Sequence, residues 1–82
     1  MESLFQEMAN KWPSAVVARS EIKKFTGGAF SGGYLANEDS RGRGPAERLL
    51  VGKRVVYSVR SLVEWLERRS RALPDKSAQE LG

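Results

Sequence analysis

The chain has 82 residues, 40% of them hydrophobic, which is the size of one small domain with a modest core. Neither cysteine nor histidine is present, so disulfides, zinc fingers and Cys/His nucleophilic catalysis are excluded. The acidic residues are scattered, and we expect no enzyme, no catalytic residue, no metal site, no cofactor and no small-molecule substrate.

Basic residues are concentrated in the second half of the chain. The net charge is +4, and between Arg41 and Arg71 nine lysines and arginines are opposed by three glutamates. A basic segment of this kind on a small domain favours a polyanionic partner. No apolar run is long enough for a membrane span and no signal peptide is visible, so we expect a cytoplasmic protein without membrane contact.

The first expected elements are a short helix and a short strand. Residues 2–11 predict a helix, which Pro13 ends because the residue before a proline avoids helical geometry. We interpret residues 1–13 as a helical N-terminal extension whose apolar face docks on the domain or on a partner. Trp12 has the same two alternatives, covering the domain or anchoring a partner. Residues 15–18 are a β-prone run.

Two short helices are expected next, joined by a glycine-containing turn. Ser20 is expected to cap the first helix, and Gly27 suits a left-handed cap at its end. Ser31 is expected to cap the second helix, which would run to about Glu38 or Asp39. This arrangement is typical of a helix-turn-helix. The two acids would oppose the helix dipole and would be repelled by a DNA backbone.

The remaining elements are a β-hairpin and a closing helix. Segments 49–51 and 54–57 are β-prone and flank Gly52-Lys53, and a two-residue loop with glycine first fits a primed turn. A helix begins at Ser58 or Val59, because apolar residues then recur at helical spacing. Residues 74–82 are polar, and we expect a disordered tail there.

Four segments occur in the order and spacing of a known family. They are Ser31-Gly32-Gly33-Tyr34-Leu35-Ala36-Asn37, Ser40-Arg41-Gly42-Arg43-Gly44-Pro45, Gly52-Lys53-Arg54-Val55-Val56-Tyr57 and Leu62-Val63-Glu64-Trp65-Leu66. Over residues 17–69, about two-thirds of its length, the chain resembles the small bacterial and phage excisionase or AlpA-like domains, which are related to the MerR DNA-binding domain. The resemblance implies an α+β fold at residues 14–73. That fold is a winged helix-turn-helix with a two-stranded antiparallel wing and a C-terminal supporting helix.

The resemblance also implies binding to double-stranded DNA, as a transcriptional regulator or an excisionase of a phage or other mobile element. The helix from Ser31 would be the recognition helix, and the hairpin would be the wing. The implied DNA-binding residues are Ser31, Gly32, Tyr34, Asn37, Arg41, Arg43, Lys53 and Arg54. An excisionase would also recruit an integrase or recombinase. Because one small domain covers little DNA, we expect a homodimer or tandem binding.

Each of these residues also has a structural interpretation. Asn37 would read an adenine edge or cap the helix end, and Tyr34 would contact a phosphate or thymine methyl or cover the core. The two arginines after the helix would clamp phosphates or lie in a solvated loop. The basic pair at the hairpin tip would contact DNA or protect an edge strand. For the whole chain, the alternative is a protein-protein interaction module that uses a winged-helix fold without binding DNA.

Overall fold

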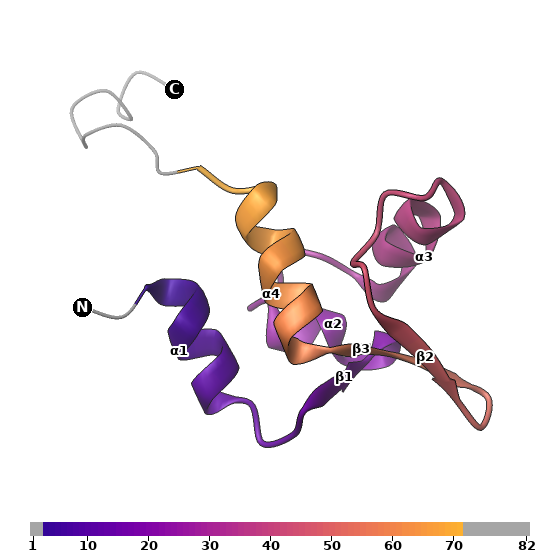
Figure 1. Ribbon diagram of the computed structural model, residues 1–82, viewed down its shortest axis with the longest axis horizontal. Helices are drawn as coiled ribbons and strands as arrows, with labels where there is room; N and C mark the ends of the chain where they lie inside the picture. The colour runs from indigo at the N-terminus through magenta and orange to yellow at the C-terminus, as the bar shows by residue number, and fades with distance from the viewer. Residues whose placement is uncertain (1–2, 72–82) are drawn as a thin grey trace.

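The computed structural model describes residues 3–71, and Figure 1 shows how its elements are arranged. These residues form an α+β fold with four α-helices, one 3-10 helix and a three-stranded sheet. The elements are α1 (Leu4–Lys11), β1 (Val16–Ala18), η1 (Arg19–Glu21), α2 (Ile22–Phe25), α3 (Gly32–Ser40), β2 (Arg48–Val51), β3 (Arg54–Ser58) and α4 (Val59–Arg68). The tail expected at 74–82 lies outside the described residues.

The sheet is antiparallel, with the strand order β1-β3-β2. The predicted hairpin is confirmed, because Val51 pairs with Arg54 across the turn and Gly52 has a φ of 63° at its first central position. The β-prone run at 15–18 adds a third strand, in which Val17 pairs with Tyr57. The sheet therefore has three strands where the sequence predicted two, because β1 pairs with a strand far away along the chain.

Serine side chains cap two of the helices, at the predicted cap Ser31 and at the predicted helix start Ser58. The Ser31 Oγ accepts a hydrogen bond from the Tyr34 N–H at 3.1 Å, which fixes the start of α3. The Ser58 Oγ accepts one from the Ser61 N–H at the same distance and fixes the start of α4. The cap predicted at Ser20 is wrong. Ser20 lies inside η1, because the chain enters the helical region earlier, through a 3-10 turn.

Glycines end α2 in the predicted way. The Gly27 N–H donates to the Lys24 carbonyl at 3.3 Å, and the Gly28 N–H donates to the Lys23 carbonyl at 2.7 Å. These two bonds form a Schellman motif, and they require the left-handed φ of 65° at Gly27. The chain can therefore reverse between α2 and α3.

The core lies between the sheet, α2, α3 and α4, and includes the fully buried Val17, Ile22 and Leu62. The predicted N-terminal helix is present as α1, and it packs against α4. Trp12 covers the domain, since its Nε1–H donates to the Val16 carbonyl at 2.9 Å and its ring meets Phe25 edge-on. In Figure 1, α1 lies beside α4 on one side of the molecule, and α3 and the hairpin lie on the other.

Candidate nucleic-acid interface

Both acids at the end of α3 face the interior. Glu38 is 5% exposed and Asp39 is 9% exposed. They lie three and four residues after the buried Leu35, so all three side chains share the inward face of the helix. The sequence predicted that these carboxylates would repel a DNA backbone. The structure instead removes them from the surface that α3 presents to solvent.

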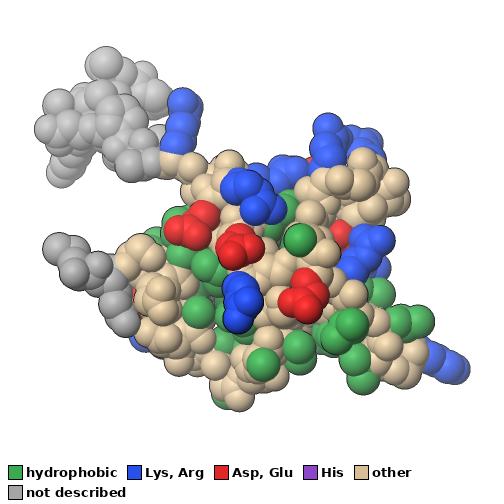
Figure 2. Space-filling model, viewed as in Figure 1, with side chains coloured by type: hydrophobic (Ala, Val, Ile, Leu, Met, Phe, Trp, Pro, Cys, Tyr) green, Lys and Arg blue, Asp and Glu red, His purple; other side chains and the backbone are tan. Residues whose placement is uncertain are grey.

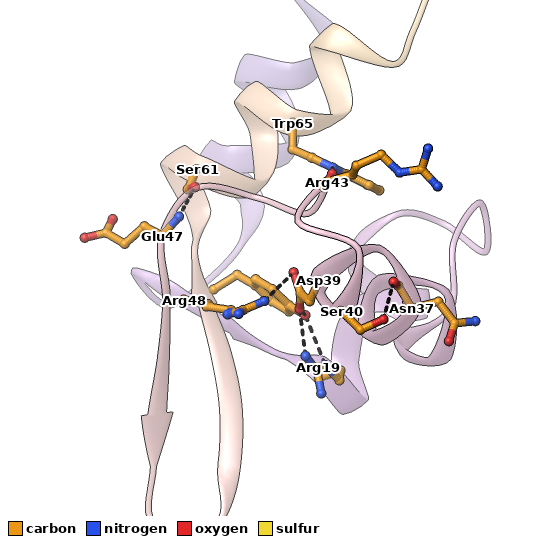
Figure 3. Close-up of polar contacts among 10 residues, drawn as sticks. Arg19, Asn37, Asp39, Ser40, Arg43, Glu47, Arg48, Ser61 and Trp65 are labelled. Carbon is orange, nitrogen blue, oxygen red and sulfur yellow. Dashed lines mark hydrogen bonds and ion pairs between the residues drawn. The ribbon is translucent and has the colours of Figure 1, made fainter.

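Asp39 joins three other elements (Figure 3). Its Oδ2 accepts hydrogen bonds from the Arg19 Nη2 at 2.7 Å and from the Tyr57 hydroxyl at 2.5 Å. The Arg48 Nη1 lies 3.0 Å from Oδ1, as an ion pair without hydrogen-bond geometry. One carboxylate thus ties α3 to η1, β2 and β3. The two guanidinium groups and the hydroxyl offset the cost of burying its charge.

This cluster shifts the pKa of Tyr57 and of Arg19. Burial and the hydrogen bond to Asp39 raise the pKa of Tyr57 to about 12, against the lowering effect of Arg19. Burial lowers the pKa of Arg19, but its hydrogen bonds to Tyr57 and Asp39 raise that pKa by more, so the net shift is upward. At neutral pH Tyr57 is therefore a neutral donor and Arg19 is charged.

Glu38 binds a second pair of arginines. It accepts a hydrogen bond from Arg69, the residue that follows α4, and the Arg43 Nε lies 3.7 Å from the same oxygen. Arg69 also lies over the Trp65 ring, with its guanidinium carbon 4.5 Å from the ring centroid. Three of the nine cations counted between Arg41 and Arg71 thus face internal carboxylates. The sequence count therefore overstates the charge that is free for a partner.

A groove of about 600 Å³ lies between the start of α3, η1 and the β2–β3 turn, and we call it the basic groove. It is lined by residues that include Arg19, Lys23, Ser31, Gly32, Lys53 and Arg54. Three of its cations, those of Lys23, Lys53 and Arg54, are exposed and have no ion pair within residues 3–71. None of the residues found to line it is acidic. Figure 2 shows lysine and arginine side chains along the edge of the molecule where α3 and the hairpin lie.

Gly32 permits the close packing that shapes this groove. A Cβ on Gly32 would lie 2.4 Å from the Arg19 carbonyl oxygen, so any other residue would push the start of α3 away from η1. The sequence predicted Gly32 as a DNA-binding residue. Its contact in the structure is with Arg19, and it acts on the groove through the position of the helix.

The structure brings together half of the predicted site residues. Ser31 and Gly32 line the basic groove together with Lys53 and Arg54 of the hairpin turn, although the two pairs are far apart in the sequence. Asn37 lies on the exposed face of α3 but is not among the residues found to line the groove. Its side chain points away from the Asp39 cluster and forms no cap at the helix end (Figure 3).

The other predicted residues lie away from the groove. The Tyr34 ring stacks on Phe30, with ring centroids 5.2 Å apart. Its hydroxyl accepts a hydrogen bond from Arg69. Its contacts thus match the interpretation in which it covers the core. Arg41 is exposed just after α3, and Arg43 lies beside Glu38; neither lines the groove.

Sequence reasoning missed Lys23 and the small residues on the outer face of α3. Gly33 and Ser40 are exposed on this face together with Asn37, and helical spacing from the buried Leu35 would have identified both. No spacing in the sequence pointed to Lys23 as a residue of the groove. Its place at the groove depends on how η1, which precedes α2, packs against α3, and no local pattern in the sequence reports that contact.

Searches for related proteins found no match among family models, curated sequences or solved structures. Within residues 3–71 no helix has the length and apolar character needed to cross a membrane. The same residues hold no group of three or more side chains suited to binding a metal ion. The geometry of the basic groove and α3 is therefore the basis for assigning a function.

Proposed function

We propose that this chain binds double-stranded DNA as a winged helix-turn-helix domain. In this proposal α2 and α3 form the helix-turn-helix, α3 is the recognition helix, the β2–β3 hairpin is the wing and α4 is the support. The observation that carries it is the basic groove, in which Lys23, Lys53 and Arg54 form no ion pair with any carboxylate of residues 3–71. A groove of one sign of charge suits a phosphate backbone, since each cation that reaches a phosphate releases a counterion.

The outer face of α3 supports the same proposal. Gly33 has only a hydrogen for a side chain and Ser40 has a short one, so the helix backbone can approach the floor of a major groove closely. Asn37 lies between them, and its side-chain amide, which has no hydrogen-bond partner within residues 3–71, has the donor and acceptor needed for an adenine edge. Affinity would therefore come mainly from phosphate contacts, and specificity from few base contacts.

The proposal is tested by measuring the anisotropy of a labelled duplex over a salt series. The logarithm of the binding constant should fall linearly with the logarithm of the salt concentration. The variant carrying Lys53→Ala and Arg54→Ala should reduce that slope by about 2, because each phosphate contact contributes about 0.9. The matched control carries Arg60→Ala and Arg68→Ala on α4, which removes the same charge away from the groove and should leave the slope unchanged.

Two results would contradict this assignment. Absence of binding to any duplex at low salt would favour the protein-protein interaction module instead. Equal slope changes for the groove variant and the α4 variant would mean that only net charge matters, and the groove would have no special part in binding.

We propose a role in transcriptional regulation or excision for a mobile element, on the strength of the resemblance of residues 17–69. An excisionase would bend its duplex and recruit an integrase or recombinase, whereas a regulator need only occupy its site. The gel mobility of circularly permuted duplexes separates the two roles. Position-dependent retardation is expected for the excisionase.

A further inference from the structure

Strand β2 is an exposed apolar edge. It pairs with β3 on one side, and within residues 3–71 no strand pairs with its other side. Its three consecutive apolar residues are exposed: Leu49 by 56%, Leu50 by 70% and Val51 by 59%. In Figure 2, hydrophobic side chains gather on the projecting hairpin, next to the basic side chains at its tip. An edge strand with this surface is a template for pairing with another chain.

The free backbone groups of this edge can be identified. The Ser58 N–H donates to the Glu47 carbonyl at 3.4 Å, so the backbone of Glu47 faces β3. Because hydrogen-bonding direction alternates along an antiparallel strand, Leu49 and Val51 also face β3. Arg48 and Leu50 therefore direct their N–H and C=O groups toward the open side.

We infer that β2 pairs with β2 of a second copy of this chain, antiparallel, about a two-fold axis at Leu50. In this register Leu50 lies opposite Leu50 of the other copy, and both have outward-facing backbone groups. Leu49 lies opposite Val51, which places apolar side chains against each other. Antiparallel pairing also brings Glu47, just before β2 of one copy, toward Lys53, in the turn just after β2 of the other.

Charge favours a second copy as the partner of this edge. Glu47 and Lys53 are exposed, and neither has an ion pair within the described part of the chain. In Figure 3 the Glu47 carboxylate points away from Ser61 and from the Asp39 cluster. A shift of one residue would oppose inward-facing to outward-facing backbone groups. The strand is thus complementary to itself, as an isologous dimer requires.

The first test is sedimentation velocity of the full chain over a wide concentration range, without DNA. We expect the mass to rise from that of a monomer to that of a dimer. Leu50→Lys puts two like charges on the axis and should keep the chain monomeric. The matched control is Leu4→Lys, which changes an equally exposed leucine (69%) on α1 and should leave the dimer intact.

The second test exchanges the charges. Glu47→Lys alone and Lys53→Glu alone each bring like charges together at the two ends of the paired strands, and each should weaken the dimer roughly tenfold. An equimolar mixture of the two variants should form a heterodimer with the affinity of the wild type, because every opposing pair is then of opposite sign. Circular dichroism of each variant confirms that it is folded.

A chain that stays monomeric at all concentrations overturns this inference. A dimer that survives Leu50→Lys, or single-charge variants that do not recombine, also overturns it and places the interface elsewhere. The salt series on the duplex measures DNA binding whatever the oligomeric state is. A failure of the dimer can therefore be distinguished from a failure of the proposed function.

Discussion

The carboxylate of Asp39 is the most constrained polar group of the site. It is buried among Arg19, Arg48 and Tyr57, and Gly44 packs against it from the loop after α3. A buried charge is tolerated only when it is paired and hydrogen-bonded, and here the partners come from three elements. The residues around Asp39 are therefore the ones at which small changes should have large effects.

Gly44 should not tolerate a side chain. A Cβ there would lie 1.9 Å from the Asp39 Oδ1, and the carboxylate cannot move without losing its partners. We expect Gly44→Ala to lower the free energy of unfolding by about 1–3 kcal/mol, measured by urea denaturation. Gly33→Ala is the control. A Cβ there meets nothing closer than the Ser31 Oγ at 3.8 Å, so it should be neutral or slightly stabilising.

Tyr57 should make the stability of the protein sensitive to alkaline pH. Its pKa is about 12 in the folded state against an ordinary value of 10.0, so the folded state holds this proton more tightly. The resulting stability is fully present below pH 10 and is lost as the pH rises toward 12, by an amount on the order of 2 kcal/mol. Tyr57→Phe should be less stable at pH 7 by about 1–2 kcal/mol and should lack this alkaline loss.

Denaturation curves at a series of pH values measure this effect. Tyr34→Phe should keep the alkaline loss of the wild type, because Tyr57 is still present. If Tyr57→Phe lost stability between pH 10 and 12 as steeply as the wild type does, the hydroxyl would not be the group responsible.

At the scale of elements, α3 is held at both ends. Gly32 sets its start against η1, and Glu38 and Asp39 tie its end to the sheet and to α4. The basic groove lies between α3 and the hairpin turn. The same ion pairs that bury the acids of α3 therefore fix the distance between the two elements proposed to contact DNA.

Removing the charge of Asp39 should loosen this arrangement. Asp39→Asn keeps the shape of the side chain but leaves Arg19 and Arg48 without their counter-charge. We expect it to lower the free energy of unfolding by about 1–3 kcal/mol, less than for a fully buried pair because both guanidinium groups are partly exposed. Glu64→Gln is the control, because Glu64 is exposed on α4 and should change stability by less than about 0.5 kcal/mol. Equal effects of the two variants would mean that the Asp39 network contributes no net stability.

The elements that sequence reasoning predicted are those with local causes. Ser31, Ser58 and Gly27 act within one turn of the chain, so the starts of α3 and α4 and the end of α2 follow from them. The cap predicted at Ser20 is wrong because η1 continues directly from β1 and already includes this residue. The pairing of β1 with β3 depends on contacts between distant segments, which no local pattern contains.

The candidate site was predicted less completely than the elements. Lys53 and Arg54 were found because a hairpin tip is exposed whatever the fold around it. The roles of Glu38 and Asp39 were not found, because acidic residues at a helix end are usually exposed and their arginine partners are distant in the sequence. Which cations remain free for a partner could be decided only in three dimensions.

At the scale of the whole molecule, the inferred dimer would place two DNA-binding faces side by side. The axis between two antiparallel strands is normal to their sheet, so both copies of α3 would lie on the same face of a joined sheet. On a duplex long enough for two copies, binding of the first would raise the effective concentration of the second. The tandem or dimeric binding expected from the sequence would then be cooperative.

Gel mobility shifts on a long and a short duplex test this coupling, which rests on both proposals. On the long duplex the wild type should pass from free to doubly bound with little singly bound complex, whereas Leu50→Lys should populate the singly bound complex. Leu4→Lys adds the same charge away from β2 and should behave as the wild type does. On the short duplex the two lysine variants should bind alike, because one groove then acts alone. Equal populations of singly bound complex for both variants on the long duplex would show that β2 does not couple the two copies.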